Sequence, residues 1–162
     1  MSIYLLLHNI RSVHNVGSIF RTADAAGVTK IFLTGYTPAP IDRFGREVKE
    51  LSKVSLGGEL SVTWEQFKTP EEVIELLKAQ DTDNSQNKLK IIALEQAENS
   101  VDYKEVTIDS DSLIIVGNEV EGISQDLLDK CDVIAEINMN GKKESLNVGV
   151  SLGIALFRML NI

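Results

Sequence analysis

The chain has 162 residues, 43% hydrophobic and 25% charged, which predicts one globular domain over residues 1–162 with a full core. No apolar run reaches the roughly 18 residues of a membrane span, and the N-terminus lacks a signal peptide, so the expected location is cytoplasmic. The single cysteine, Cys131, excludes an internal disulfide and a multi-cysteine metal site, and the net charge of −8 argues by its sum against a nucleic-acid partner.

Short apolar segments and helical patterns alternate along the first half of the chain. The helical segment has Asn15 as its expected N-cap and Gly27 as its stop. A proline-rich loop follows the second strand, with one helical turn expected near its end. The expected elements are a strand at Ile3–His8, a helix at Val16–Ala26, a strand at Lys30–Thr34, the loop Gly35–Glu50 and a strand at Leu60–Trp64.

The second half continues the alternation. Its elements are a helix at Pro70–Ala79 with Thr69 as cap, a polar surface loop at Asp81–Asn87, strands at Lys90–Leu94, Leu113–Gly117 and Val133–Ile137, a helix at Ser124–Lys130 and a last helix from Leu146. This order predicts an α/β fold with a mostly parallel sheet and helices on both faces. Ligands bind such sheets at the carboxyl ends of the strands. The candidate loops are therefore Asn9–Asn15, Gly117–Gly122 and Asn138–Ser145.

The last helix is apolar nearly all round, which predicts that it is buried. Leu146, Val150 and Ile154 recur at the spacing of one helical face. Gly149 and Gly153 each cost about 1 kcal/mol relative to alanine inside a helix, so we expect a close neighbour beside their backbone.

The first loop leads into a helix whose first turn offers free N–H groups to an anion. Arg21 lies one to two turns further, and its guanidinium suits a phosphate or a developing oxyanion. A capped helix with a solvated arginine explains the segment equally well. His14 is a weaker candidate general base, because no carboxylate is evidently placed to orient it.

The second loop places a glycine and carboxylates after a buried strand. Glu119 could orient an arginine or asparagine or bind a ligand, whereas Glu121 is better explained as solvated. The chain contains no dinucleotide-binding fingerprint, P-loop, nucleophile elbow or zinc motif, so no metal is expected.

The charges are unevenly distributed. Residues 1–58 carry seven basic against four acidic side chains, residues 59–136 carry six against nineteen, and residues 137–162 carry three against one. If the ends meet in the fold, they create a positive field on an acidic body. That field would permit a polyanionic partner.

Taken in series, the three loops closely resemble the signature motifs of the SpoU (TrmH-like) branch of the SPOUT RNA methyltransferases. The segments are Asn15-Val-Gly-Ser-Ile-Phe-Arg21, Gly117-Asn-Glu-Val-Glu-Gly122 and Glu144-Ser-Leu-Asn147-Val-Gly149, and Lys53-Val-Ser-Leu-Gly57 with Trp64 beyond it adds to the likeness. The resemblance covers essentially the whole chain.

The resemblance implies a C-terminal trefoil knot, S-adenosyl-L-methionine as cofactor, and a homodimer with the active site at its interface. The reaction it implies is methylation of a ribose 2′-hydroxyl in tRNA or rRNA. The carried-over catalytic positions are Asn15, Arg21, Glu119, Ser145 and Asn147, and the cofactor positions are Leu94, Gly117, Ile137, Ser145 and Leu146. The last helix would then be both knot core and dimer face.

Within this interpretation, the enzyme must align oxygen and methyl group and stabilise developing alkoxide charge. An arginine stays protonated at neutral pH, which favours electrostatic stabilisation by Arg21 over proton abstraction. The candidate RNA-binding residues are Arg11, Arg43, Arg46, Lys49, Lys53, Lys142 and Lys143.

Two alternatives differ in class. A knotted methyltransferase acting on a base nitrogen is disfavoured by Arg21, and a catalytically silent RNA-binding module stays open because the isoelectric point is 4.8. The chain departs from the family's pattern at Asn138, where a proline is frequent. Without a recognisable RNA-binding extension, it resembles the family's minimal members.

Overall fold

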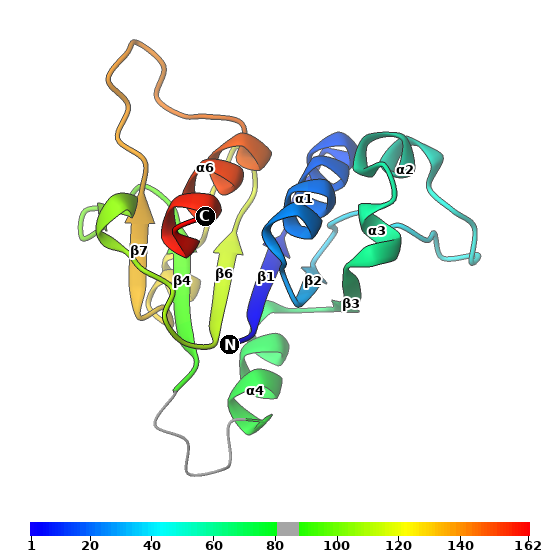
Figure 1. Ribbon diagram of the computed structural model, residues 1–162, viewed down its shortest axis with the longest axis horizontal. Helices are drawn as coiled ribbons and strands as arrows, with labels where there is room; N and C mark the ends of the chain where they lie inside the picture. The colour runs from blue at the N-terminus through cyan, green and yellow to red at the C-terminus, as the bar shows by residue number, and fades with distance from the viewer. Residues whose placement is uncertain (81–87) are drawn as a thin grey trace.

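The computed structural model describes residues 1–80 and 88–162, so the surface loop expected at 81–87 lies outside the described residues. The described part forms one seven-stranded sheet in the order β3-β2-β1-β6-β4-β7-β5, and every strand pairing in it is parallel (Figure 1). The strands are β1 (Ile3–His8), β2 (Lys30–Thr34), β3 (Thr63–Phe67), β4 (Lys90–Leu94), β5 (Val101–Asp102), β6 (Ser112–Val116) and β7 (Val133–Glu136).

Helices cover both faces of this sheet, as the alternating pattern predicts. One face packs against α1 (Val13–Ala26), α6 (Val148–Leu160), α2 (Lys49–Ser55) and the 3-10 turn η1 (Tyr103–Glu105), and the other face packs against α4 (Pro70–Gln80) and α5 (Gln125–Leu128). The side chains of a strand alternate between the two cores, so Leu5 and Leu7 join the first core and Leu6 joins the second. A short helix, α3 (Gly58–Ser61), leads into β3.

Most boundaries match the predictions to within two residues, and the starts of two elements differ by three. Helix α1 begins at Val13 because the hydroxyl of Ser12, not the side chain of Asn15, caps it by accepting a hydrogen bond from Asn15 N at 3.2 Å. The third strand begins at Thr63, because Gly58–Ser61 coils into α3 and leaves Leu60 exposed.

The predicted burial of the last helix on all sides is wrong for the single chain. The side of α6 that faces the core carries Leu152, Leu156 and Met159, which are buried. The opposite face, preceded by Leu146, is exposed: Leu146, Val150 and Ile154 are 41%, 52% and 41% exposed. A helix that is apolar all round therefore presents an uncovered apolar stripe.

The two glycines of α6 face α1, beside which α6 lies in Figure 1. A Cβ atom on Gly149 would lie 3.4 Å from Ser18 Oγ, and one on Gly153 would lie 3.6 Å from Thr22 Cγ2. The close neighbour expected beside these glycines is thus a helix of the same chain. None of the helices within the described residues is long and apolar enough to cross a membrane.

Candidate active site

The loops after β1 and β6 meet at the carboxylate of Glu119. Its Oε2 accepts a hydrogen bond from Arg11 N at 2.9 Å, and its Oε1 accepts from Ser12 N at 3.1 Å and from Asn15 Nδ2 at 2.9 Å. Partial burial alone would raise the pKa of Glu119, but these hydrogen bonds outweigh it and lower the pKa below its ordinary value. Glu119 is therefore an ionised anchor for the first turn of α1.

Asn147 brings the third loop to the same place. Its Nδ2 donates to Asn15 Oδ1 at 2.9 Å, while its Oδ1 accepts from Gly149 N and Val150 N and caps α6. Asn15 is thus the central link of a chain from Asn147 to Glu119. Since Ser12 caps α1, the side chain of Asn15 is free to make this link. Both predicted catalytic asparagines are therefore linked to Glu119, Asn15 directly and Asn147 through Asn15.

The loop at Gly117–Gly122 is a tight turn that holds Glu119 in place. Asn118 and Gly122 exchange two backbone hydrogen bonds, of 3.2 and 2.9 Å, and Gly122 has a φ of +69°, which favours glycine. Gly117 lies so close to this turn that a Cβ atom on it would be 2.5 Å from Gly122 O.

Asn118 lines a pocket between these loops, and the sequence analysis did not single it out. Its buried side chain donates to Asn9 O at 2.9 Å and to the Tyr36 hydroxyl at 2.8 Å, and it accepts from Val120 N and Glu121 N. The acceptor half of this pattern is the local turn bonding typical of asparagine. The donor half is tertiary and gives no signal in the sequence.

A pocket of about 690 Å³ opens between these loops at the carboxyl edge of β4, β6 and β7, within the usual range for small-molecule sites. All five predicted cofactor positions line it, together with Asn15, Glu119 and Asn147; these are Leu94, Gly117, Ile137, Ser145 and Leu146. Further lining residues include Glu95, Gln96, Glu136, Met139, Glu144 and Ser151.

The rim of the pocket is tied together by two further contacts. Gln96 Nε2 donates to Glu144 O at 3.0 Å, and Glu95 Oε2 accepts from Ile123 N at 3.0 Å. Asn138, where the family often has proline, donates to Asp102 Oδ2 at 3.2 Å and so anchors the start of its loop by a side chain.

Among the described residues, the lining contains four glutamates and no lysine or arginine. A lining of this charge attracts a cationic small molecule and repels a phosphate group. The described residues contain no group of three or more histidine, cysteine or acidic side chains that could hold a metal ion.

Arg21 does not line the pocket. Its side chain lies on the exposed side of α1, and its guanidinium makes no hydrogen bond or ion pair with any residue in the described ranges. His14 is exposed on the same helix and also lies outside the lining. The structure thus brings four of the five predicted catalytic residues to one pocket and leaves the arginine outside it.

The seven predicted RNA-binding residues are all exposed, and six of them fall into two groups. Lys142 and Lys143 lie on the loop that rises above β7, whereas Arg43 and Arg46 lie in the loop on the far side of the molecule (Figure 1). Lys49 and Lys53 follow that second loop on α2, and Arg11 lies between the groups, next to Glu119. The loops that carry the two groups lie on opposite sides of the view in Figure 1.

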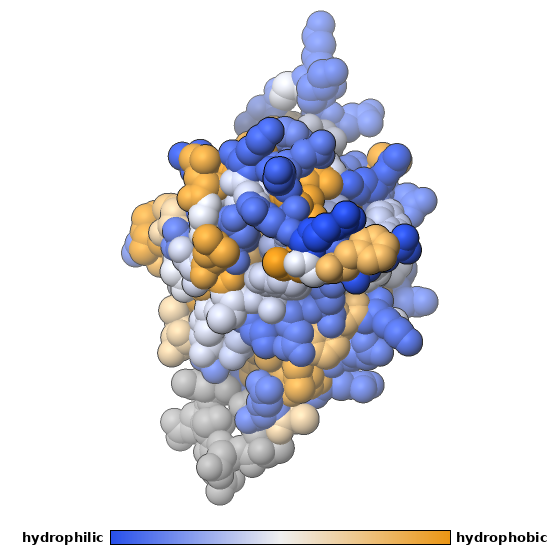
Figure 2. Space-filling model, turned by 90° about the vertical axis from the view of Figure 1, so that its right-hand side faces the viewer, coloured by the Kyte–Doolittle hydropathy of each residue, from blue (hydrophilic) through white to orange (hydrophobic). Residues whose placement is uncertain are grey.

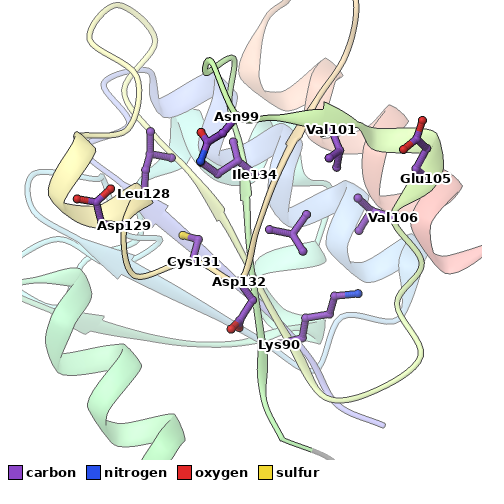
Figure 3. A pocket seen from close by; sticks show the side chains of 11 residues that line it. Lys90, Asn99, Val101, Glu105, Val106, Leu128, Asp129, Cys131, Asp132 and Ile134 are labelled. Carbon is purple, nitrogen blue, oxygen red and sulfur yellow. The ribbon is translucent and has the colours of Figure 1, made fainter.

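A second pocket, of about 680 Å³, lies between α5, β7 and β5 (Figure 3). Cys131, Leu128, Val101 and Val106 point toward it, and none of the predicted site residues lines it. Burial and the neighbouring Asp132 raise the pKa of the Cys131 thiol to about 11, so this thiol is unreactive at neutral pH.

The fold and the first pocket together define an α/β protein that binds its ligand at the carboxyl edge of a parallel sheet. A family model described as the SpoU rRNA Methylase family matches residues 2–157. The chain therefore belongs to the SpoU rRNA methylase family.

Known relatives agree with this membership. A protein of Staphylococcus saprophyticus named as a TrmH family tRNA/rRNA methyltransferase is 31% identical over 159 residues, which are 98% of this chain and 58% of that protein. The chain thus spans less than two thirds of the length of this relative.

Solved structures confirm the predicted fold class. An AdoMet-bound rRNA methyltransferase from Sinorhizobium meliloti matches with a TM-score of 0.83 and 28% identity, over 98% of this chain and 55% of that one. A TrmH/SpoU tRNA modifying enzyme of A. aeolicus matches with a TM-score of 0.78 and 26% identity, over 98% and 73%.

Proposed function

We propose that this protein transfers a methyl group from S-adenosyl-L-methionine to the ribose 2′-hydroxyl of a tRNA or rRNA. The observation that carries the proposal is the hydrogen-bonded chain Asn147–Asn15–Glu119, which joins three loops around one pocket. These loops are the segments that resemble the family motifs, and family membership supports the same activity.

The pocket suits this cofactor by the chemistry of its lining. S-adenosyl-L-methionine carries a sulfonium and an ammonium group, which the four glutamates attract. Leu94, Ile137 and Leu146 offer apolar walls to an adenosine, and the exposed Ser145 offers a hydroxyl. When bound, the cofactor supplies an activated methyl group.

The residues of the chain then have to position the ribose and stabilise its oxygen as negative charge develops. Asn15 and Asn147 are fixed by each other and by Glu119, so the second N–H of each side-chain amide is preorganised to donate to a hydroxyl group. The acidic lining keeps phosphates outside the pocket, so the RNA approaches with a ribose while its backbone contacts exposed cations outside the pocket.

Arg21 completes this site through a homodimer in our proposal. It is exposed and outside the pocket of its own chain, and the apolar stripe of Leu146, Val150 and Ile154 needs a cover. A second copy covering this stripe would bring its Arg21 to the pocket, where a guanidinium stabilises an alkoxide.

The C-terminal trefoil knot implied by the family resemblance stays a prediction.

The test is transfer of labelled methyl groups to total RNA from a strain lacking the gene, followed by nuclease digestion and mass spectrometry. We expect 2′-O-methylated nucleotides. A methylated base would establish the base-nitrogen alternative, and no transfer with retained RNA binding would establish a silent binding module.

The variant Arg21→Ala distinguishes a role of Arg21 in the transfer step from a role in cofactor binding. We expect kcat to fall by at least about a hundredfold while cofactor affinity, measured by calorimetry, changes less than about threefold. Equal losses of both would mean that Arg21 holds the cofactor or the fold.

A further inference from the structure

The loop between β2 and α2 exposes an aromatic ring in an unusual setting. Phe44 is 66% exposed, and the guanidinium carbons of Arg43 and Arg46 lie 4.7 and 5.0 Å from the centre of its ring. The ring and its two guanidinium groups are therefore a distinct feature, which we call the Phe44 cluster.

The Phe44 cluster is held in a fixed turn. The carboxylate of Asp42 accepts hydrogen bonds from Phe44 N at 2.8 Å, Arg46 N at 3.0 Å and Arg46 Nε at 2.9 Å. Asp42 N also donates to Arg46 O, and Gly45 closes the turn with a φ of +77°. The ring is thus presented to solvent at little further cost in conformational entropy on binding.

The base of this loop is attached to the candidate active site. The Tyr36 hydroxyl accepts a hydrogen bond from Asn118 Nδ2 at 2.8 Å, and Tyr36 N donates to Asn9 Oδ1 at 3.3 Å. Since the loop leaves β2 at its carboxyl end, it lies on the same edge of the sheet as the pocket. Figure 2 views the molecule from the side of this loop and shows hydrophobic side chains among strongly hydrophilic ones.

Charge alone does not explain the cluster. Segment 41–49 carries three cations against two carboxylates, and Asp42 is committed to Arg46 by an ion pair of 2.9 Å. Arg43 makes no ion pair with any residue in the described ranges and is free for a phosphate. Attraction to a bare phosphate chain is therefore weak, and the exposed ring supplies a second kind of contact. Aromatic rings and guanidinium planes stack on unpaired bases.

We propose that Phe44 stacks on an unpaired base of the RNA substrate, while Arg43 contacts an adjoining phosphate. This inference rests on the proposed function and names the substrate class more closely: an RNA that presents a single-stranded loop. The stacked base lies outside the pocket, because no residue of segment 41–49 lines it. Phe44 acts in binding and positioning and takes no part in the transfer.

Steady-state methylation of total RNA from the strain lacking the gene tests the role of the ring. Loss of one stacked base weakens RNA binding by about 5- to 100-fold, so Phe44→Ala should raise KM for RNA by this factor. The value of kcat should change less than about twofold. Phe44→Tyr should keep the wild-type KM, and Phe44→Leu, which is apolar but cannot stack, should behave like Phe44→Ala. Leu60→Ala alters an exposed side chain outside the Phe44 cluster and should leave KM and kcat unchanged.

A spectroscopic test does not depend on turnover. Trp64 is the only tryptophan, so Phe44→Trp combined with Trp64→Phe places one reporter in the cluster. We expect a single-stranded 12-residue oligouridylate to quench its fluorescence, and an abasic RNA of equal length to quench it at least about fivefold less.

The outcomes separate the two proposals. If the wild type transfers no methyl group but the reporter is quenched by bases, the proposed function fails and the stacking inference stands. If the wild type is active but Phe44→Ala and Phe44→Leu retain its KM, the stacking inference is overturned. A change in sedimentation coefficient for Phe44→Ala would overturn it too, because the ring would then contact a second protein copy.

Discussion

Gly117→Ala tests whether the tight turn at 117–122 supports the whole site. A Cβ atom at this position would lie 2.5 Å from Gly122 O and 2.6 Å from Ile123 Cγ1. The first distance is 0.9 Å short of the 3.4 Å at which ordinary contact begins. Gly122 O accepts the 3.2 Å hydrogen bond from Asn118 N, so moving it aside breaks this bond. The turn would then no longer hold Glu119 against α1.

The magnitude follows from these contacts. Overpacking costs about 1–3 kcal/mol and the lost hydrogen bond about 1 kcal/mol, so the free energy of unfolding should fall by about 2–4 kcal/mol. For a chain of this size, the melting temperature should fall by about 5–15 °C. Urea denaturation measures the first quantity and calorimetry the second. Binding of S-adenosyl-L-methionine should weaken by at least about tenfold.

Gly141→Ala is the matched control. Gly141 lies in the loop before α6, and a Cβ atom on it would meet nothing within 4 Å. The free energy of unfolding of the Gly141→Ala variant should stay within about 0.5 kcal/mol of the wild-type value. If Gly117→Ala were as stable as Gly141→Ala and bound the cofactor equally well, the argument from the tight turn would be refuted.

The remaining predictions concern Glu119 and α6. Glu119→Gln replaces one acceptor oxygen by an NH2 group that faces an N–H donor, so urea denaturation at pH 7 should show a loss of about 1 kcal/mol. Because the pKa of folded Glu119 lies below its ordinary 4.5, this loss should be full above pH 4.5 and shrink as the pH falls through the folded value; a constant difference down to pH 3 would contradict the assignment. Gly153→Ala has room for its Cβ, 3.6 Å from Thr22 Cγ2, and should raise stability by about 0.5–1 kcal/mol, so a large loss would disprove the packing described for α6 and α1. Val150→Glu places a charge in the apolar stripe and should weaken the proposed dimer by at least about tenfold in analytical ultracentrifugation, whereas unchanged sedimentation would exclude the stripe as its interface.

The sequence predicted the layers of the fold because alternation between strand and helix patterns reflects burial directly. Runs such as Ile3–His8 are apolar on both faces, and the sheet buries both of their faces. Strand β5 was missed because two residues at a sheet edge carry no periodic pattern. The third strand was misplaced because Leu60 extended an apolar run that the structure leaves exposed.

The candidate site was predictable as a set of loops but not as a network. Local chemistry marked Asn15, Glu119 and Asn147, yet the choice of Ser12 over Asn15 as the cap depends on the link from Asn15 to Asn147, 132 positions away. The role of Asn118 also depends on tertiary contacts, with Asn9 and Tyr36. The exposed stripe of α6 could not be foreseen from composition, since an apolar helix has the same sequence whether its own chain or a second copy covers it.

The strand order has a consequence for how the protein acquires its site during synthesis. Strand β1 pairs with β6, and Ser2 N donates to Asp111, 109 positions later. Strand β1 of the nascent chain therefore lacks its neighbour β6 until most of the protein has been made. Strand pairings between such distant segments form slowly. Asn15 meets its partner Asn147 later still. The Asn147–Asn15–Glu119 link can therefore form only after Asn147 has been translated. Cofactor binding would then report that the whole chain has folded.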